Sequence, residues 1–465
     1  MNKKYKISSS VMLVIVIAIV IAVNAFVTAL TKKFPIKLDM TPNQIFSISD
    51  STKEYLKNYK TPTDIYILAP ETNEDSWVKS VLDKYAAENS NIKLKNIDLN
   101  SNPTFGKKYV SDGGSLSGKY VIIDGGEKFK TFAQQDLYNI NSQTGRPSSI
   151  NVEAKITSAL KYVSNTELLK AYVITGHSEI AQDGVKGALE DSGYEVKELN
   201  LITEDIPESA SLLVSMSPSS DYTVAETAKL DAYLEKGGHA QFYFDIQQSE
   251  GLTNLYSYLE KWGIKVNDSA AVEQSKSNAI SLGGSMALMI PEIEQDDITD
   301  AITENKRVIA YFPYAKTLTK LFDNSNNISV KPLLTTSSSA YAASDYNNIE
   351  KKDTDESGKL NIGILASNSQ NNSSVYVSGT SMLLNYSQED LASTYGFANY
   401  DYFLNICSYM QGSTDDYTVS AKSLAVNTIT IKPLIAYIIG IVFAIVIPLA
   451  ILITGIVVWF KRRHL

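Results

Sequence analysis

Along the first part of the chain, apolar residues recur with the spacing of strands in some segments and of helices in others. Residues 63–68 and 92–97 alternate with a period of two, which is typical of strands, and the apolar side chains at 77, 81, 82 and 85 between them fall on one helical face. The sequence Asp-Gly-Gly-Glu at 124–127 separates two short apolar runs and predicts a hairpin, because such turns need residues with positive φ. We therefore expect a first α/β domain over residues 32–149.

From residue 150 onward, strand and helix patterns take turns. Helices are predicted over 152–163, 182–191, 223–236 and 252–262, with strands at 172–175, 194–199, 211–214, 239–245 and 264–266. This alternation predicts an α/β fold with a doubly wound, mainly parallel sheet covered on both faces. The pattern loosens into a polar insertion around 268–358 and returns as a strand at 375–378 and a helix at 399–410. We expect a second α/β domain over residues 150–411.

Both ends of the chain carry a long apolar run. Residues 11–31 and 433–460 are almost free of charge, and about 20 apolar residues are enough to cross a bilayer as a helix. Basic residues lie in the segments 1–10 and 461–465 outside these runs, so the positive-inside rule places both termini in the cytoplasm. The sequence thus predicts a cell-membrane protein with one transmembrane helix at each end, an extracellular or periplasmic main region, and a tether over 412–432.

A cleaved signal peptide is the alternative for the first apolar run, because it follows a basic start. Its apolar core is longer than the roughly 7–15 residues of a signal peptide, and no clear small-residue cleavage site follows. We therefore expect the segment to be retained.

Composition removes several classes of function. The 42 basic and 51 acidic residues give a net charge of −9, which argues against a nucleic-acid partner. Cys407 is the single cysteine, so an intrachain disulfide and a thiolate metal cluster are excluded, and its apolar helical setting predicts a core residue. With three scattered histidines and no phosphate-binding loop, we expect no metal, no cofactor and no ATPase activity of its own.

The stretch 170–179 is the best candidate for a functional site. A short β-branched and aromatic run ends here in a small polar turn that carries His177. In open α/β sheets, ligands usually bind beside such a strand-to-helix crossing. Ser178 adjoins His177, but the nucleophile elbow G-x-S-x-G is absent, so we predict no catalytic residue.

Several segments of the chain resemble one family in order. Leu38-Asp39 with Thr41 and Phe46–Ser49 is similar to an LDxT…YSLS start, and residues 173–179 resemble a TGHGE turn. Residues 230–238 with Phe244-Asp245 resemble an LxxYlxxGGxxlxxxD segment, and residues 399–405 with the basic C-terminal end resemble the close of the family. The chain is similar to the gliding-motility GldG-like auxiliary proteins of ABC-type transport systems. It departs from them at Ser378–Ser381, where relatives carry acidic residues, and at Ser178, which replaces a glycine.

The resemblance implies an extracytoplasmic α/β region, distantly amidotransferase-like, beside an ABC permease and its cytoplasmic ATPase, in contact with membrane lipid. Together with the apolar run at each end and the absence of catalytic motifs, the resemblance favours a scaffold or a protein that presents substrate, without turnover of its own. Two alternatives stay open: a membrane-tethered amidotransferase-like hydrolase that acts through the His177 turn, and a binder of envelope glycan or peptide. The candidate ligand-binding residues are Thr175, Gly176, His177, Ser178, Glu179 and Asp245.

Overall fold

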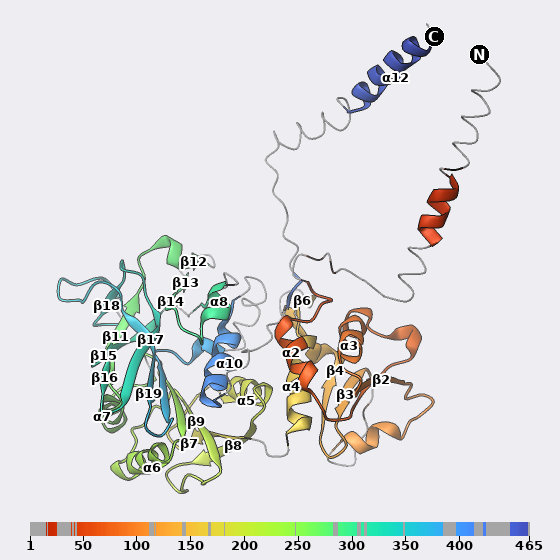
Figure 1. The fold of residues 1–465 in the computed structure, drawn as a ribbon. Coiled ribbons are helices and arrows are strands. Elements are labelled where there is room, and N and C mark those ends of the chain that lie inside the picture. The colour runs from red at the N-terminus through yellow and green to blue at the C-terminus, as the bar shows by residue number, and fades with distance from the viewer. Residues whose placement is uncertain are drawn as a thin grey trace. The chain divides into compact units, whose positions relative to one another are not determined.

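The structure is a computed structural model in which the folded sheets lie within one compact unit, Met1–Leu424, while Ala425–Leu465 forms a second unit (Figure 1). The residues that it describes are 15, 17–25, 39, 41, 44–110, 116, 118–141, 146–165, 169–180, 182–246, 248–281, 287–304, 308–310, 314–346, 349–384, 397–412, 422–424 and 447–463.

A four-stranded sheet with the order β2-β1-β3-β4 forms the first α/β region. Its strands are β1 (Thr63–Leu68), β2 (Ile92–Ile97), β3 (Tyr120–Asp124) and β4 (Phe129–Ala133). β1 and β2 are parallel, whereas β3 and β4 form the predicted hairpin, in which Gly126 has a φ of 94°. The strand and hairpin predictions for this region are confirmed.

Three helices cover one face of this sheet: α2 (Asp50–Asn58), α3 (Ser76–Glu88) and α4 (Val152–Ser164). Because side chains alternate along a strand, Ile65 and Ile67 of β1 pack against these helices, while Leu68 packs on the other face beside Tyr109. α4 thus contributes to the core of the first sheet. The sequence-based domain limits stay predictions.

The second sheet has a parallel half with the order β8-β7-β9-β10-β20. Its strands are β7 (Lys170–Thr175), β8 (Glu195–Asn200), β9 (Ala210–Met216), β10 (His239–Tyr243) and β20 (Ser374–Ser378). β7 pairs with β8 on one side and with β9 on the other, and both pairings are parallel. The direction of winding therefore reverses beside β7, which is the topological switch point of an open α/β sheet.

Helices cover both faces of this parallel half, as expected for a doubly wound sheet. Ala171 and Val173 of β7 pack in the cluster that contains residues of α5 (Gln182–Asp191) and α10 (Asn399–Met410). Tyr172 and Ile174 point the other way, into the cluster with α6 (Val224–Glu235) and α7 (Thr253–Lys261). The complete burial of Val173 and Ile174 on opposite faces explains why the strand is a continuous apolar run.

The predicted mainly parallel sheet is wrong, because the other half of the sheet is antiparallel. β20 pairs with β19 (Asn361–Asn368), and the order continues through β15 (Ala315–Lys320) and β11 (Ile264–Val272) to β18 (Tyr341–Ala343). β17 (Ile328–Thr335) also pairs with β19, and the short strands β14 (Glu292–Ile293) and β16 (Asn324–Ser325) pair with β17. The stretch 268–358, read as a polar insertion, thus supplies strands to the main sheet.

The prediction of a transmembrane helix at each end, and with it the predicted membrane localisation, is also contradicted. Among the described residues, none of the helices is both long enough and apolar enough to cross a membrane. The C-terminal helix α12 (Ile447–Arg463) has 17 residues. The structure describes residues 15 and 17–25 of the predicted segment 11–31 and residues 447–460 of the segment 433–460, and the other residues of both segments lie outside the described residues.

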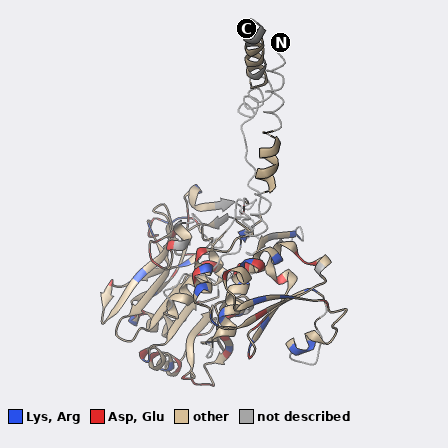
Figure 2. Cartoon of the chain, turned by 45° about the vertical axis from the view of Figure 1, so that its right-hand side comes forward, with Lys and Arg blue, Asp and Glu red and all other residues tan. Residues whose placement is uncertain are grey.

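Charges of both signs are distributed over the folded part of the chain. Figure 2 shows Lys and Arg residues interspersed with Asp and Glu residues, and many of them form exposed ion pairs such as Lys79–Asp83 and Lys261–Asp231. Such exposed pairs contribute little to stability, typically about 0–1 kcal/mol each. The absence of a nucleic-acid partner stays a prediction.

Candidate functional site

The candidate site is the turn that follows β7. Gly176 has a φ of 112°, and a Cβ atom there would lie 2.9 Å from the Asn200 side-chain oxygen. Ser178 also has positive φ, at 58°, and its side chain is exposed. Gly176 and Ser178, one on each side of His177, reverse the chain sharply through their positive φ angles. The imidazole therefore points inward, and His177 is 2% exposed.

His177 lies between two glutamates. Its Nδ1 atom is 3.2 Å from Glu179 Oε1 and its Nε2 atom is 3.0 Å from Glu226 Oε1. The side chains of Glu179 and Glu226 are 2% and 5% exposed, so the whole group is removed from water. The His177 N–H also donates to Glu179 Oε2 at 2.9 Å, which closes a short ring within the turn.

Glu226 is held by the first turn of α6. Thr223 caps this helix: its hydroxyl accepts from the Glu226 N–H at 3.3 Å, and Glu226 Oε2 accepts from the Thr223 N–H at 2.8 Å. This reciprocal arrangement is a capping box. The ring of Tyr222, just before the cap, stacks on His177 with centroids 4.0 Å apart and an interplanar angle of 8°. The start of α6 therefore clamps the imidazole from two directions.

The electrostatics favour a charged imidazole. Burial opposes the imidazolium, yet the hydrogen bond to Glu179 and the charge of Glu226 outweigh it, so the pKa of His177 lies above its ordinary value of 6.5. In the protonated ring both nitrogens donate, one to each carboxylate. A catalytic base needs a free lone pair within reach of a nucleophile, and within the described part of the chain both nitrogens of this ring face carboxylates.

Main-chain hydrogen bonds join the two loops at the switch point. The carbonyl of His177 accepts from the N–H groups of Ser219, at 2.9 Å, and Ser220, at 3.2 Å, both on the loop after β9. Ligands of open α/β sheets bind between these two loops. Here the loops after β7 and β9 are tied directly to one another.

Asp245 lies two residues beyond the end of β10 and fastens the loop after β20. Its carboxylate accepts from the Ser381 N–H at 2.9 Å and from the Thr380 hydroxyl at 3.1 Å, and it also bonds the Ser381 hydroxyl. Its own N–H donates to Ser217 Oγ at 3.1 Å. Asp245 therefore makes contacts separate from those of His177, with the loop after β9 between them.

The structure brings together only some of the residues that were predicted to bind a ligand. His177 and Glu179 are in direct contact, Thr175 and Gly176 shape the strand end, and Ser178 points to solvent. Glu226 and Tyr222 were missed by sequence reasoning, although the capping pattern of Thr223 with Glu226 is visible in the sequence. Among the described residues, there is no cluster of three or more His, Cys, Asp or Glu side chains that could hold a metal ion. Ligand binding at this turn stays a prediction.

The predicted core position of Cys407 is confirmed. The thiol is fully buried in α10, and burial raises its pKa to about 12. A thiol with such a pKa is protonated at neutral pH, which removes the nucleophilic form.

Gly379 adjoins the Asp245 contacts and gives a testable packing constraint. A Cβ atom there would lie 2.0 Å from the carbonyl oxygen of Lys316, which is main chain and cannot rotate away. We expect Gly379→Ala to lower the free energy of unfolding by about 1–3 kcal/mol, as overpacking does. Urea unfolding of the full chain measures this effect. Gly106→Ala, whose nearest neighbour is the Leu116 side chain at 3.1 Å, is the control, and equal loss in both variants would contradict the argument.

The fold and the site together define a class of protein. This is an α/β protein with a flavodoxin-like strand order in its parallel half, and its switch point carries an ion-paired histidine within a closed turn.

Residues 169–381 match the family model described as "ABC-type uncharacterized transport system". This match confirms the resemblance to GldG-like auxiliary proteins of ABC-type transport systems. The description of this family names no reaction. Residues 42–139, which span the first sheet, match a domain model of unknown function.

Three solved structures are similar to this chain at low identity. The N-terminal domain of mmIFT52 is 16% identical, covers 54% of this chain and 100% of its own, and has a TM-score of 0.40. PurLQS from Thermotoga maritima is 14% identical, with 52% and 100% covered and a TM-score of 0.28. A ThuA-like protein from Parabacteroides merdae is 10% identical, with 55% and 98% covered and a TM-score of 0.32. These likenesses carry no functional argument. No curated protein matches the chain.

Proposed function

We propose that this chain is a non-catalytic auxiliary protein that scaffolds the permease and the ATPase of an ABC-type transport system or presents substrate to them. The family match over residues 169–381 is the observation that carries the proposal. The geometry of the His177 turn supports it, because both ring nitrogens are used by Glu179 and Glu226. A hydrolase acting through this turn would need one of these nitrogens for its nucleophile.

Co-purification tests the assembly. The tagged full chain, isolated in mild detergent, is expected to recover one permease and one ATPase in constant ratio to itself, as measured by quantitative mass spectrometry. Cells that express the untagged chain are the control. Repeated recovery of the chain alone would contradict the proposal.

A substitution at the turn tests the absence of turnover. Ser178 is exposed beside His177 and is the nearest hydroxyl in sequence that could act as a nucleophile. Ser178→Ala is therefore expected to leave the transport rate of the assembled system unchanged. A loss of transport in this variant, with normal assembly, would favour the hydrolase instead.

A further inference from the structure

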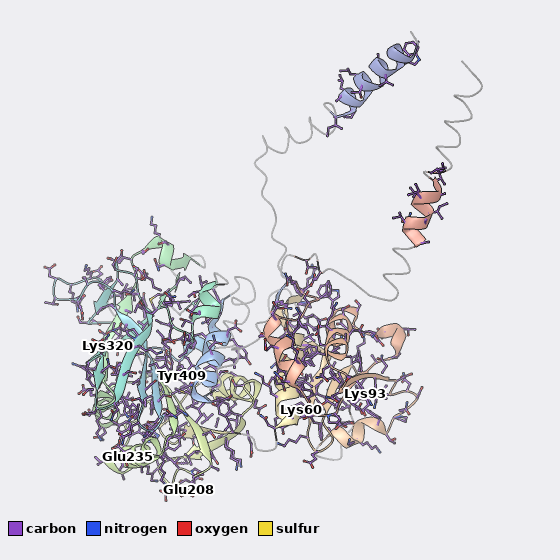
Figure 3. The ribbon with its side chains drawn as sticks, viewed as in Figure 1. Lys60, Lys93, Glu208, Glu235, Lys320 and Tyr409 are labelled. Carbon is purple, nitrogen blue, oxygen red and sulfur yellow. The ribbon has the colours of Figure 1, made fainter. Side chains whose placement is uncertain are left out.

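A cavity of about 540 Å³ lies at the edge of the second sheet opposite the His177 turn. Leu169, Ala210 and His239 line it, and these residues precede or begin the parallel strands β7, β9 and β10. The cavity is therefore at the amino ends of the strands, whereas the predicted site residues follow the carboxyl ends. Figure 3 labels Glu208, which lines the mouth of the cavity on the loop before β9. The volume of the cavity is in the range of small-molecule sites, about 300–1,000 Å³.

The inner wall of the cavity is apolar and firmly held. Tyr194 and Met410 are each 2% exposed and Tyr233 is 9% exposed. The Tyr194 hydroxyl donates to the Cys407 carbonyl at 3.4 Å, and the Tyr233 hydroxyl donates to the His239 carbonyl at 3.1 Å. Their polar groups are thus satisfied by the protein, and they support the cavity from below. Leu169, which is 41% exposed, gives a ligand apolar surface within the cavity.

His239 supplies one hydrogen-bond donor to this wall. Its Nδ1 atom lies 2.8 Å from the hydroxyl of Ser374, which is 1% exposed. Nδ1 is the hydrogen-bond partner that the described residues give this hydroxyl, and when the hydroxyl donates, the ring proton is on Nε2. Burial lowers the pKa of His239 to about 4, so the ring stays neutral at neutral pH. Nε2 has no hydrogen-bond partner in the described part of the chain.

The cavity lining carries two ion pairs, Lys236–Glu208 and Lys229–Asp205. Lys236, at the end of α6, is 3.7 Å from Glu208, and their side chains are 72% and 93% exposed. An exposed pair at this distance is worth little, so a ligand with its own charges can replace it. A carboxylate would pair with Lys236 and an ammonium group with Glu208.

We propose that this cavity binds short zwitterionic peptides with apolar side chains. The apolar side chain lies against Leu169, a peptide carbonyl accepts from His239 Nε2, and the two termini meet Lys236 and Glu208. This binding site does not depend on the proposed assembly with a permease and an ATPase, and it is tested on the isolated chain.

Calorimetric titration of the purified full chain with the dipeptide Leu-Phe is the direct experiment. We expect saturable binding at one site with a Kd below about 1 mM. Gly-Gly lacks the apolar side chains and is expected not to bind. The capped peptide N-acetyl-Leu-Phe-amide keeps them without the charges and should bind roughly fivefold more weakly, since the exposed charges contribute modestly.

Three variants locate the binding site. Ala232 is an exposed residue of α6 that lines the cavity, and Ala232→Trp should fill it and weaken binding by more than roughly tenfold. Ala228→Trp, exposed on the same helix but outside the cavity lining, is the matched control and should bind normally. His239→Phe keeps a ring without the donor and is expected to weaken binding roughly tenfold.

Three results would overturn the proposal. They are no saturable binding of Leu-Phe, binding that Ala232→Trp and Ala228→Trp leave equally intact, and binding of a neutral disaccharide in place of the dipeptide. Circular dichroism of each variant confirms that the fold is kept.

Discussion

Replacing His177 by alanine is expected to lower the free energy of unfolding by about 3–5 kcal/mol, the range found when one partner of a buried ion pair is removed. The substitution leaves Glu179 and Glu226, both at most 5% exposed at their side chains, with a cavity in place of the imidazolium. It also removes the ring on which Tyr222 stacks. Urea unfolding of the full chain, followed by circular dichroism, measures the change.

The control for this prediction is the neighbouring residue. Ser178→Ala alters an exposed side chain in the same turn and should change stability by no more than about 0.5 kcal/mol. If His177→Ala unfolds at the same urea concentration as Ser178→Ala, the histidine does not hold the turn together. Retained stability with lost transport would instead indicate a chemical role.

The difference in stability between the native chain and His177→Ala is expected to change with pH in a definite direction. The pKa of His177 is raised in the folded protein, so the stability that its charge contributes is fully present below the unfolded value of 6.5. This contribution to stability is lost as the pH rises through the raised pKa of His177. The difference in stability between the native chain and His177→Ala should therefore narrow from pH 6 toward high pH, and a difference that widens would contradict the ion-paired state.

Sequence periodicity predicted those parts of the fold in which local pattern and burial agree. β7 is buried on both faces and reads as an apolar run, and α5 runs from Gln182 to Asp191 as expected. The antiparallel half was missed because its strands carry polar residues inside the protein. In β15, Lys316 and Thr317 are 2% and 3% exposed, and Lys316 pairs with Asp268. A buried lysine that reaches an exposed aspartate on the neighbouring strand interrupts the apolar pattern of its own strand.

Local sequence pattern also predicted only part of the candidate site. The strand-to-turn pattern identified His177 and Glu179, which are two residues apart. Glu226 is 49 residues away and reaches the ring only because β9 pairs beside β7 and delivers the start of α6 to the same edge. The sequence pattern marks Glu226 as a capping residue, but the sheet order decides which side chain it meets.

A further buried carboxylate, that of Glu153, joins two parts of the first unit that are distant in sequence. Glu153, in the first turn of α4, is 4% exposed and accepts from the Ser49 N–H at 2.6 Å. Its other oxygen lies 2.7 Å from Lys422 Nζ, which also donates to the Ser47 carbonyl. Lys422 belongs to β21 (Lys422–Ser423), which pairs with β6 (Arg146–Ile150). Glu153 therefore fixes a segment that precedes α2 and a segment that follows α10.

Lys422→Met is expected to lower the free energy of unfolding by about 3 kcal/mol, because it leaves the Glu153 carboxylate buried without its cation. The double variant Glu153→Gln with Lys422→Met should recover most of this loss, since a neutral amide has no buried charge to compensate and still accepts from Ser49. Urea unfolding of the single and double variants forms a double-mutant cycle. Lys79→Met removes an exposed ion pair with Asp83 and should cost no more than about 1 kcal/mol. Equal losses for Lys422→Met and Lys79→Met would show that the two segments are held by strand pairing alone.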